Sequence, residues 1–125
     1  MRDASFDFLK NLVAAPSPSG YEQPAQRVFR DYVGQFAEIS TDVLGNVISF
    51  IPGVGDNRLK VMLVGHCDEI GFQVKYIDDN GFIWFGAVGG VDPHITVGQK
   101  VVIYSGERKV TGVIGRKPVQ NVACD

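Results

Sequence analysis

The sequence has little of what marks a secreted, membrane-spanning or nucleic-acid-binding protein. It has two cysteines among 125 residues, and because Cys67 and Cys124 lack C-x-x-C spacing, we expect neither a disulfide framework nor a cysteine zinc site. The longest apolar runs are far below the roughly 18 residues that span a bilayer, and no signal-peptide core follows Met1. The formal net charge is -2 and the sequence contains no run of Lys or Arg. Both observations argue against nucleic acid or a membrane surface as partners. We therefore expect a cytoplasmic protein.

What the sequence does contain is the composition of a folded protein. Hydrophobic residues make up 45% of the chain and charged residues 21%, which is enough apolar material for a sizeable core. Disorder is therefore not expected.

The first half of the sequence predicts two helices followed by three strands. Apolar residues recur at helical spacing over 6–13 and predict the first helix. Ser19 and Glu22 have the spacing of a capping box, and an apolar stripe over 21–36 predicts the second helix behind it. The strands are expected over 38–42, 47–51 and 61–66.

The second half predicts strands separated by turns. The turn residues Asp78-Asp79-Asn80-Gly81 indicate a hairpin, and short strands at this spacing are typical of a small β-barrel. We therefore predict an α/β fold with a boundary near residue 70, in which residues 1–70 begin an α/β layer and residues 71–125 form an all-β module. The strands of this part are expected over 72–77, 82–88, 99–104 and 109–114.

The end of the strand over 61–66 carries the candidate chemistry. Its run has no polar alternation, which predicts burial on both faces, and open α/β sheets bind ligands at such strand ends. It stops at His66, with Asp68 two residues later. Neutral imidazole is a common metal ligand, and a carboxylate on its other nitrogen fixes the tautomer. A histidine bonded to a backbone carbonyl is the alternative. Cys67 lies between His66 and Asp68 and is expected to be a small, partly buried residue beside the strand end.

Six short motifs follow one another along the chain. They are SGYE at 19–22, DVLGN at 42–46, GHCDEIGF at 65–72, DNGF at 79–82, GQKV at 98–101 and GVIGRKP at 112–118. In this order they resemble the amino-terminal third of the tetrahedral and glutamyl aminopeptidases, a family that includes proteins labelled cellulase or endoglucanase M.

The resemblance implies a metallopeptidase that acts on peptides with two divalent ions, zinc or cobalt. It implies that residues 1–70 begin an α/β catalytic domain and that residues 71–125 belong to an inserted β-barrel domain. It also implies homo-oligomers that range from dimers to twelve subunits. His66 matches a metal ligand and Asp68 matches the catalytic-site carboxylate that holds it. The remaining ligands and the general base match segments beyond residue 125, so at most one ligand is expected here. We expect a fragment that is inactive on its own and that associates through exposed apolar surface.

Three other interpretations have less support. The first is that His94 binds a metal, but this residue is expected in a loop between strands and away from any metal. The carboxylate pairs at 68–69 and 78–79 could suggest a glycosidase, but neighbours on a strand point to opposite faces and the second pair fits a turn. A non-catalytic β-barrel interaction module with a helical amino-terminal extension stays open, and in it the His66 and Asp68 pair would be structural.

Overall fold

The computed structural model describes residues 3–55 and 59–116 and divides into two compact units. One unit runs to Gly89 and the other begins at Gly90. This division lies after the first β-hairpin of the second half, and the domain boundary near residue 70 stays a prediction. The described residues form helices and two-stranded antiparallel sheets, which agrees with the mixed α and β class. No helix in the described part of the chain is long and apolar enough to cross a membrane.

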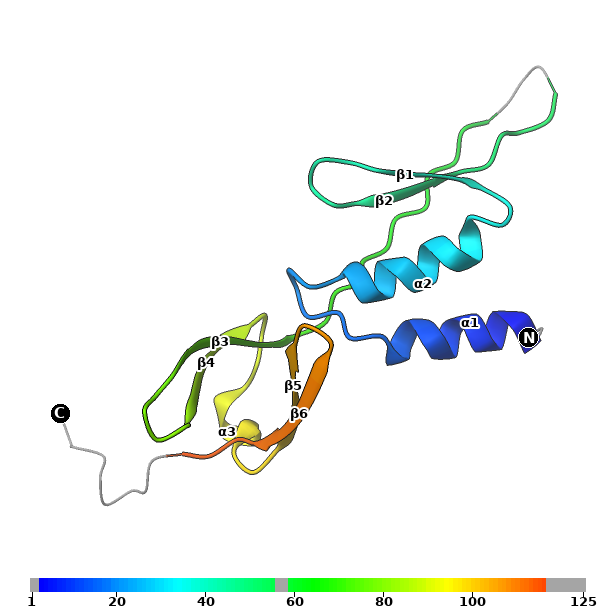
Figure 1. Ribbon diagram of the computed structural model, residues 1–125. Coiled ribbons are helices and arrows are strands. Elements are labelled where there is room, and N and C mark those ends of the chain that lie inside the picture. Colours follow the sequence, from blue (N-terminus) through cyan, green and yellow to red (C-terminus); the bar gives the residue numbers. More distant parts are fainter. Residues whose placement is uncertain (1–2, 56–58, 117–125) are drawn as a thin grey trace. The chain divides into compact units, whose positions relative to one another are not determined.

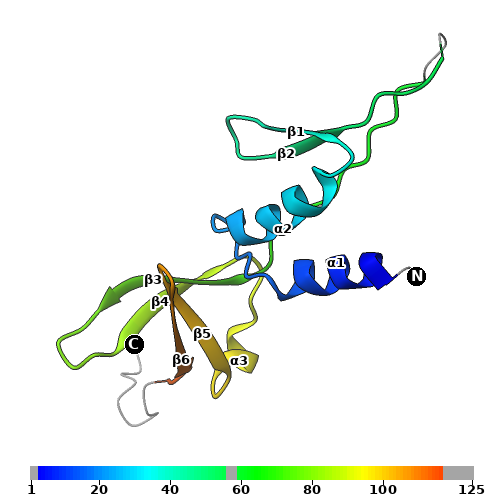
Figure 2. The same cartoon turned by 45° about the vertical axis from the view of Figure 1, so that its right-hand side comes forward.

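The two predicted helices are present at the start of the first unit, where they pack side by side in antiparallel directions (Figures 1 and 2). They are α1 (Asp3–Ala14) and α2 (Gln23–Val33). The rings of Phe8 and Tyr32 stack across them with centroids 4.2 Å apart. Ala25 of α2 is 1% exposed, so the small side chain allows close packing at that point of the helix.

The start of α2 differs from the predicted capping box. Glu22 is the N-cap residue, without a side-chain cap hydrogen bond, and its Oε1 accepts a hydrogen bond from Gly20 N at 2.6 Å. The Ser19 hydroxyl instead donates to the carboxylate of Asp68. In a capping box the serine oxygen would accept from a backbone N–H, whereas here the hydroxyl donates to a charged acceptor, which makes a stronger hydrogen bond than a neutral one.

A tight hairpin follows α2. It pairs β1 (Glu38–Thr41) with β2 (Val47–Phe50), close to the predicted strands. Asp42 holds the turn: its Oδ1 accepts from Leu44 N and Asn46 N, both at 2.9 Å, and its Oδ2 accepts from Asn46 Nδ2 at 2.8 Å. Gly45 adopts a φ of +89°, which only glycine tolerates readily.

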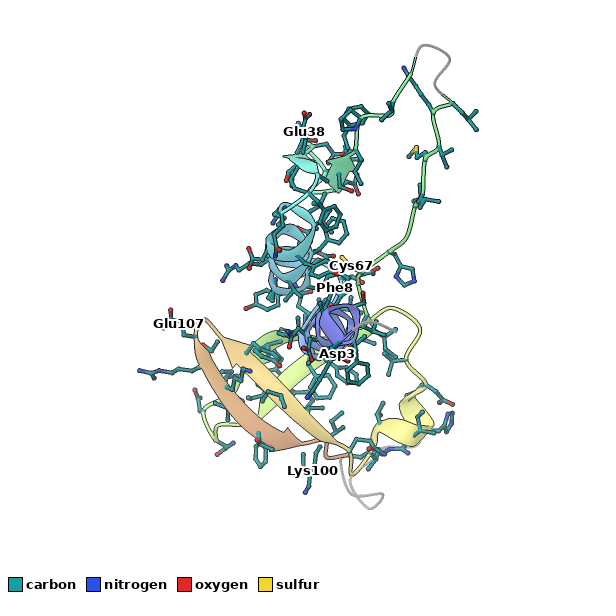
Figure 3. The ribbon with its side chains drawn as sticks, turned by 90° about the vertical axis from the view of Figure 1, so that its right-hand side faces the viewer. Asp3, Phe8, Glu38, Cys67, Lys100 and Glu107 are labelled. Atoms are coloured by element: carbon teal, nitrogen blue, oxygen red, sulfur yellow. The ribbon has the colours of Figure 1, made fainter. Side chains whose placement is uncertain are left out.

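The predicted strand over 61–66 is wrong for the described residues. The segment is extended, but its side chains project with no strand beside them (Figure 3). From Val61 to Val64 the residues are between 73% and 92% exposed. A strand needs a neighbour that satisfies its N–H and C=O groups, and the described residues offer none here. The first unit therefore shows two of the three strands expected before residue 70.

The first unit ends in the predicted hairpin of β3 (Gly71–Ile77) and β4 (Ile83–Val88). A bulge between Val74 and Tyr76 shifts the register, and Tyr76 stacks on Trp84 with centroids 5.6 Å apart. Asp78 closes the turn by accepting hydrogen bonds from Asn80 N and Phe82 N. The predicted turn chemistry is confirmed.

The second unit contains one more hairpin and a short helix. Strands β5 (Lys100–Ser105) and β6 (Arg108–Val113) pair as predicted. The predicted loop before them contains α3 (Pro93–Thr96), which Asp92 caps by accepting from His94 N. Ile114 is 6% exposed and joins the loop before β5 through hydrogen bonds with Gly98 and Gln99. Closure of these hairpins into a barrel stays a prediction.

The Asp42 turn makes the first unit sensitive to acid. The hydrogen bond from the Asn46 side chain, followed by that from the Asn46 backbone, lowers the pKa of Asp42 from its usual 3.8. A carboxyl with a lowered folded pKa stabilises the fold above its unfolded pKa, and this contribution is lost as the pH falls through the folded value. We expect Asp42→Asn to be less stable than the parent near neutral pH and to match it in acid below the folded pKa, as measured by urea unfolding.

The matched variant is Asn46→Ala, which removes the largest cause of the shift. The ¹³C chemical shift of the Asp42 carboxyl, followed through an acid titration, should give a higher pKa in this variant than in the parent. A parent pKa at or above 3.8 would contradict the assignment.

Candidate metal-ligand site

His66 and Asp68 lie in direct contact on the segment that leads into β3. The distance from His66 Nδ1 to Asp68 Oδ1 is 3.0 Å, and that to the Asp68 carbonyl oxygen is 3.2 Å. Both oxygens accept, so in the neutral ring Nδ1 carries the hydrogen and Nε2 carries the lone pair. The His66 side chain is 86% exposed. The ring therefore presents one nitrogen that is able to bind a cation.

The carboxylate of Asp68 has a second partner that the sequence did not reveal. Ser19 Oγ donates a hydrogen bond to Asp68 Oδ2 at 2.5 Å. This hydrogen bond, followed by that from His66, lowers the pKa of Asp68. The carboxyl is therefore ionised near neutral pH, which is the form that holds an imidazole N–H. The contact joins residues 49 positions apart, so no local pattern could have indicated it.

Three further hydrogen bonds tie the Ser19 segment to the chain beyond Asp68, and we call them the Ser17–Glu69 clasp. Glu69 N donates to Ser17 O at 2.8 Å, and Ser19 N donates to Glu69 O at 3.2 Å. Ser17 N donates to the Glu69 side chain at 3.0 Å. Ser17 is 6% exposed, so the clasp is shielded from water at this end. It fixes the backbone on both sides of the Ser19 and Asp68 contact.

Cys67 does not behave as predicted. It is exposed rather than partly buried, and Figure 3 shows it on the extended segment. Desolvation, followed by the negative charge of Glu22, raises the pKa of its thiol. Because the thiolate is the form that binds metals, Cys67 is a poor ligand near neutral pH. Cys124 lies outside the described residues.

His94 forms a similar pair with Asp92 in the second unit. Its Nδ1 lies 3.0 Å from Asp92 Oδ1, the same oxygen that accepts from His94 N at 2.9 Å. Capping of α3 accounts for this carboxylate without a metal. The described residues contain no group of three or more His, Cys, Asp or Glu side chains that could hold a metal ion. The absence of His94 from a metal site stays a prediction.

Three carboxylates of the two acidic pairs are engaged in hydrogen bonds within the described residues. Asp68 contacts His66 and Ser19, whereas Glu69 accepts from Ser17 N. Asp78 is engaged in the β3–β4 turn. Each of these three carboxylates thus has hydrogen-bond partners within the chain that account for it.

Comparison with known proteins decides the family. The sequence model of the M42 glutamyl aminopeptidases matches residues 45–123. The chain belongs to the M42 glutamyl aminopeptidase family. The resemblance seen in the sequence motifs is therefore confirmed.

Curated relatives of this M42 chain are named aminopeptidases. It is 39% identical to a putative aminopeptidase of Acetivibrio thermocellus over 102 residues, which are 81% of this chain and 30% of the relative. It is 33% identical to the lysyl aminopeptidase of Pyrococcus furiosus over 115 residues, which are 90% of this chain and 32% of the relative. The chain spans about a third of the length of these relatives.

Solved structures agree with the family. A TET aminopeptidase from a marine sediment Thaumarchaeota archaeon has a TM-score of 0.84 at 32% identity, covering 98% of this chain and 34% of that one. A Thermotoga maritima protein named endoglucanase has a TM-score of 0.77 at 38% identity, covering 88% and 34%. The Pyrococcus horikoshii TET1 peptidase, which can assemble into a tetrahedron or a large octahedral shell, has a TM-score of 0.75 at 29% identity, covering 96% and 36%.

Close packing at the clasp predicts a sensitive glycine. A Cβ atom added at Gly71 would lie 3.0 Å from Pro18 Cβ, so Gly71→Ala must push the clasp apart. We expect it to lower the free energy of unfolding by about 1–3 kcal/mol, as other overpacked sites do. The matched control is Gly65→Ala, because a Cβ there meets nothing within 4 Å. Urea unfolding of both variants tests this, and equal stabilities would contradict it.

Proposed function

We propose that the chain is the amino-terminal part of a metal-dependent aminopeptidase that removes residues from the amino ends of peptides with two divalent ions. The observation that carries the proposal is the geometry of His66, whose Nδ1 is held by Asp68 at 3.0 Å while the ring stays 86% exposed. Membership of the M42 family and the aminopeptidase names of its relatives support the reaction class.

The donor set of the described residues fits one ligand position of such a centre. An oriented neutral imidazole is a good ligand for zinc and cobalt, and His66 provides it. The described part of the chain gathers no three candidate ligands, so His66 alone cannot hold an ion tightly. The remaining ligands and the general base are proposed to lie outside the described residues.

The chain's own contribution to the reaction is positioning. Asp68 keeps the proton of His66 on Nδ1, so that Nε2 is the ligand atom. The negative charge of Asp68 also makes the Nε2 lone pair more basic and therefore a better metal ligand. The Ser17–Glu69 clasp fixes the backbone around this pair. When bound, divalent ions polarise a peptide carbonyl and lower the pKa of water. His66 and Asp68 are thus assigned as ligand and catalytic-site support.

We further propose that the protein acts as a homo-oligomer. A structural neighbour is described as a dodecamer, and another as a tetrahedron or an octahedral shell. The exposed apolar side chains over 59–64 are consistent with burial against other protein. A cytoplasmic location and a peptide substrate, without nucleic acid or membrane partners, complete the proposal.

The decisive variant is His66→Ala in the full-length protein. Changes to groups that support metal ligands cost about 10–100-fold in activity or metal affinity, so we expect loss of a ligand to lower kcat/KM by at least about 100-fold. Hydrolysis of a panel of aminoacyl p-nitroanilides with added zinc or cobalt measures this.

The matched control for that experiment is His94→Ala, which removes an equally exposed histidine with a similar aspartate partner. It should keep the activity of the parent. If the full-length parent hydrolyses no substrate and binds no metal, the non-catalytic interaction module is the correct interpretation. If His66→Ala keeps full activity and metal content, His66 is not a ligand.

The 125-residue chain should itself release no p-nitroaniline. It supplies one metal ligand and its support, which is too little for tight metal binding. The assay uses the purified chain with added zinc or cobalt and the full-length protein as its positive control. Product that persists after purification and disappears with a chelator would show that the chain contains a complete site.

A further inference from the structure

We propose that Ser19 is a positioning residue for the metal site, acting through Asp68 on His66. Its hydroxyl fixes one oxygen of the Asp68 carboxylate, so that the other oxygen stays in place to hold the His66 ring. The inference rests on the proposed function and extends it to a residue from a separate segment of the chain.

The two oxygens of Asp68 have separate tasks. Oδ2 accepts from Ser19 Oγ at 2.5 Å, and Oδ1 accepts from His66 Nδ1 at 3.0 Å. The Asp68 side chain is 39% exposed, so water competes for both oxygens. With Oδ2 anchored, rotation of the carboxylate is restricted and Oδ1 keeps its direction toward the ring. Without the anchor, the carboxylate can rotate toward solvent. The hydrogen bond from His66 Nδ1 is then lost, and the Nδ1–H group can donate to other acceptors.

Ser19 is held in place independently of its hydroxyl. Its backbone N–H donates to Glu69 O, the carbonyl next to Asp68 in sequence. On its other side, Tyr21 N donates to Pro18 O at 2.7 Å and closes a turn in which Gly20 has a φ of +90°. The backbone on both sides of the Ser19 and Asp68 contact is thus fixed, and the hydroxyl reaches Asp68 without ordering a flexible side chain.

This arrangement separates positioning from mere support of the fold. Removal of the hydroxyl leaves the backbone clasp of Ser17 and Glu69 intact. A positioning role therefore predicts a loss of metal affinity and turnover that a threonine restores, because threonine keeps the hydroxyl. A purely structural role predicts a lower melting temperature without a selective effect on the metal.

The test compares Ser19→Ala and Ser19→Thr in the full-length protein. Zinc affinity is measured by competition with a chromophoric chelator, and the visible absorption of the cobalt-loaded form reports the ligand field. We expect Ser19→Ala to bind zinc about tenfold more weakly, at the low end of the range for groups that support ligands. We expect kcat to fall by a similar factor with KM within about twofold, since the substrate contacts are unchanged. Ser19→Thr should stay close to the parent.

The matched control is Ser49→Ala, which removes an exposed hydroxyl of β2 in the same unit and should leave zinc affinity unchanged. If Ser19→Ala is too unstable to measure, Ser19→Cys serves instead, because a thiol is a weak donor and should lower zinc affinity in the same direction. Parental zinc affinity in Ser19→Ala or Ser19→Cys overturns the role of Ser19, as does a loss that threonine does not restore. If the parent itself binds no zinc and cleaves no peptide, the proposed function fails and the role of Ser19 fails with it.

Discussion

The Ser17–Glu69 clasp is the contact on which the candidate site depends. His66 ends an extended segment that pairs with no strand among the described residues, so nothing described on its amino-terminal side fixes its position. The constraint comes from the residues that follow it. The backbone of Glu69 is hydrogen-bonded to Ser17 and Ser19, and its side chain accepts a hydrogen bond from Ser17 N. Gly71 lets Pro18 approach closely. The ring is thus oriented from its carboxyl-terminal side, through Asp68.

Most of the fold could be predicted because its signals are local. The apolar spacing before Pro16 and the turn residues from Asp78 to Gly81 determine helices and hairpins within a few positions of themselves. The His66 and Asp68 contact was also predictable, because the partners are only two positions apart. Ser19 was not. Its spacing to Glu22 satisfies the rule for a helix cap, whereas in the structure its hydroxyl donates to the carboxylate of Asp68, which is 49 positions away. A local pattern cannot indicate a partner that lies so far along the chain.

The segment over 61–64 shows a prediction that failed although its sequence signal is local. Its unbroken apolar sequence correctly indicates residues that favour burial, but burial needs a partner and the described residues provide none. In the described part of the chain the buried apolar residues are Ala25, Val33 and Ile114, although 45% of the sequence is hydrophobic. The apolar content therefore exceeds what these residues bury among themselves. Exposed apolar surface of this kind favours association with other protein, which supports the proposed homo-oligomer.

The chain contains an internal comparison that shows what distinguishes a candidate ligand from an ordinary histidine. His66 and His94 each have Nδ1 at 3.0 Å from an aspartate Oδ1, and each side chain is nearly 90% exposed, at 86% and 88%. Distance and exposure therefore do not separate them. The difference lies in the carboxylate. In Asp92 a single oxygen serves both the ring and the helix cap within three residues, whereas Asp68 gives one oxygen to the ring and the other to a hydroxyl from a separate segment. A purely local turn needs no such long-range anchor, and a ligand that must keep its direction while an ion and a substrate exchange does.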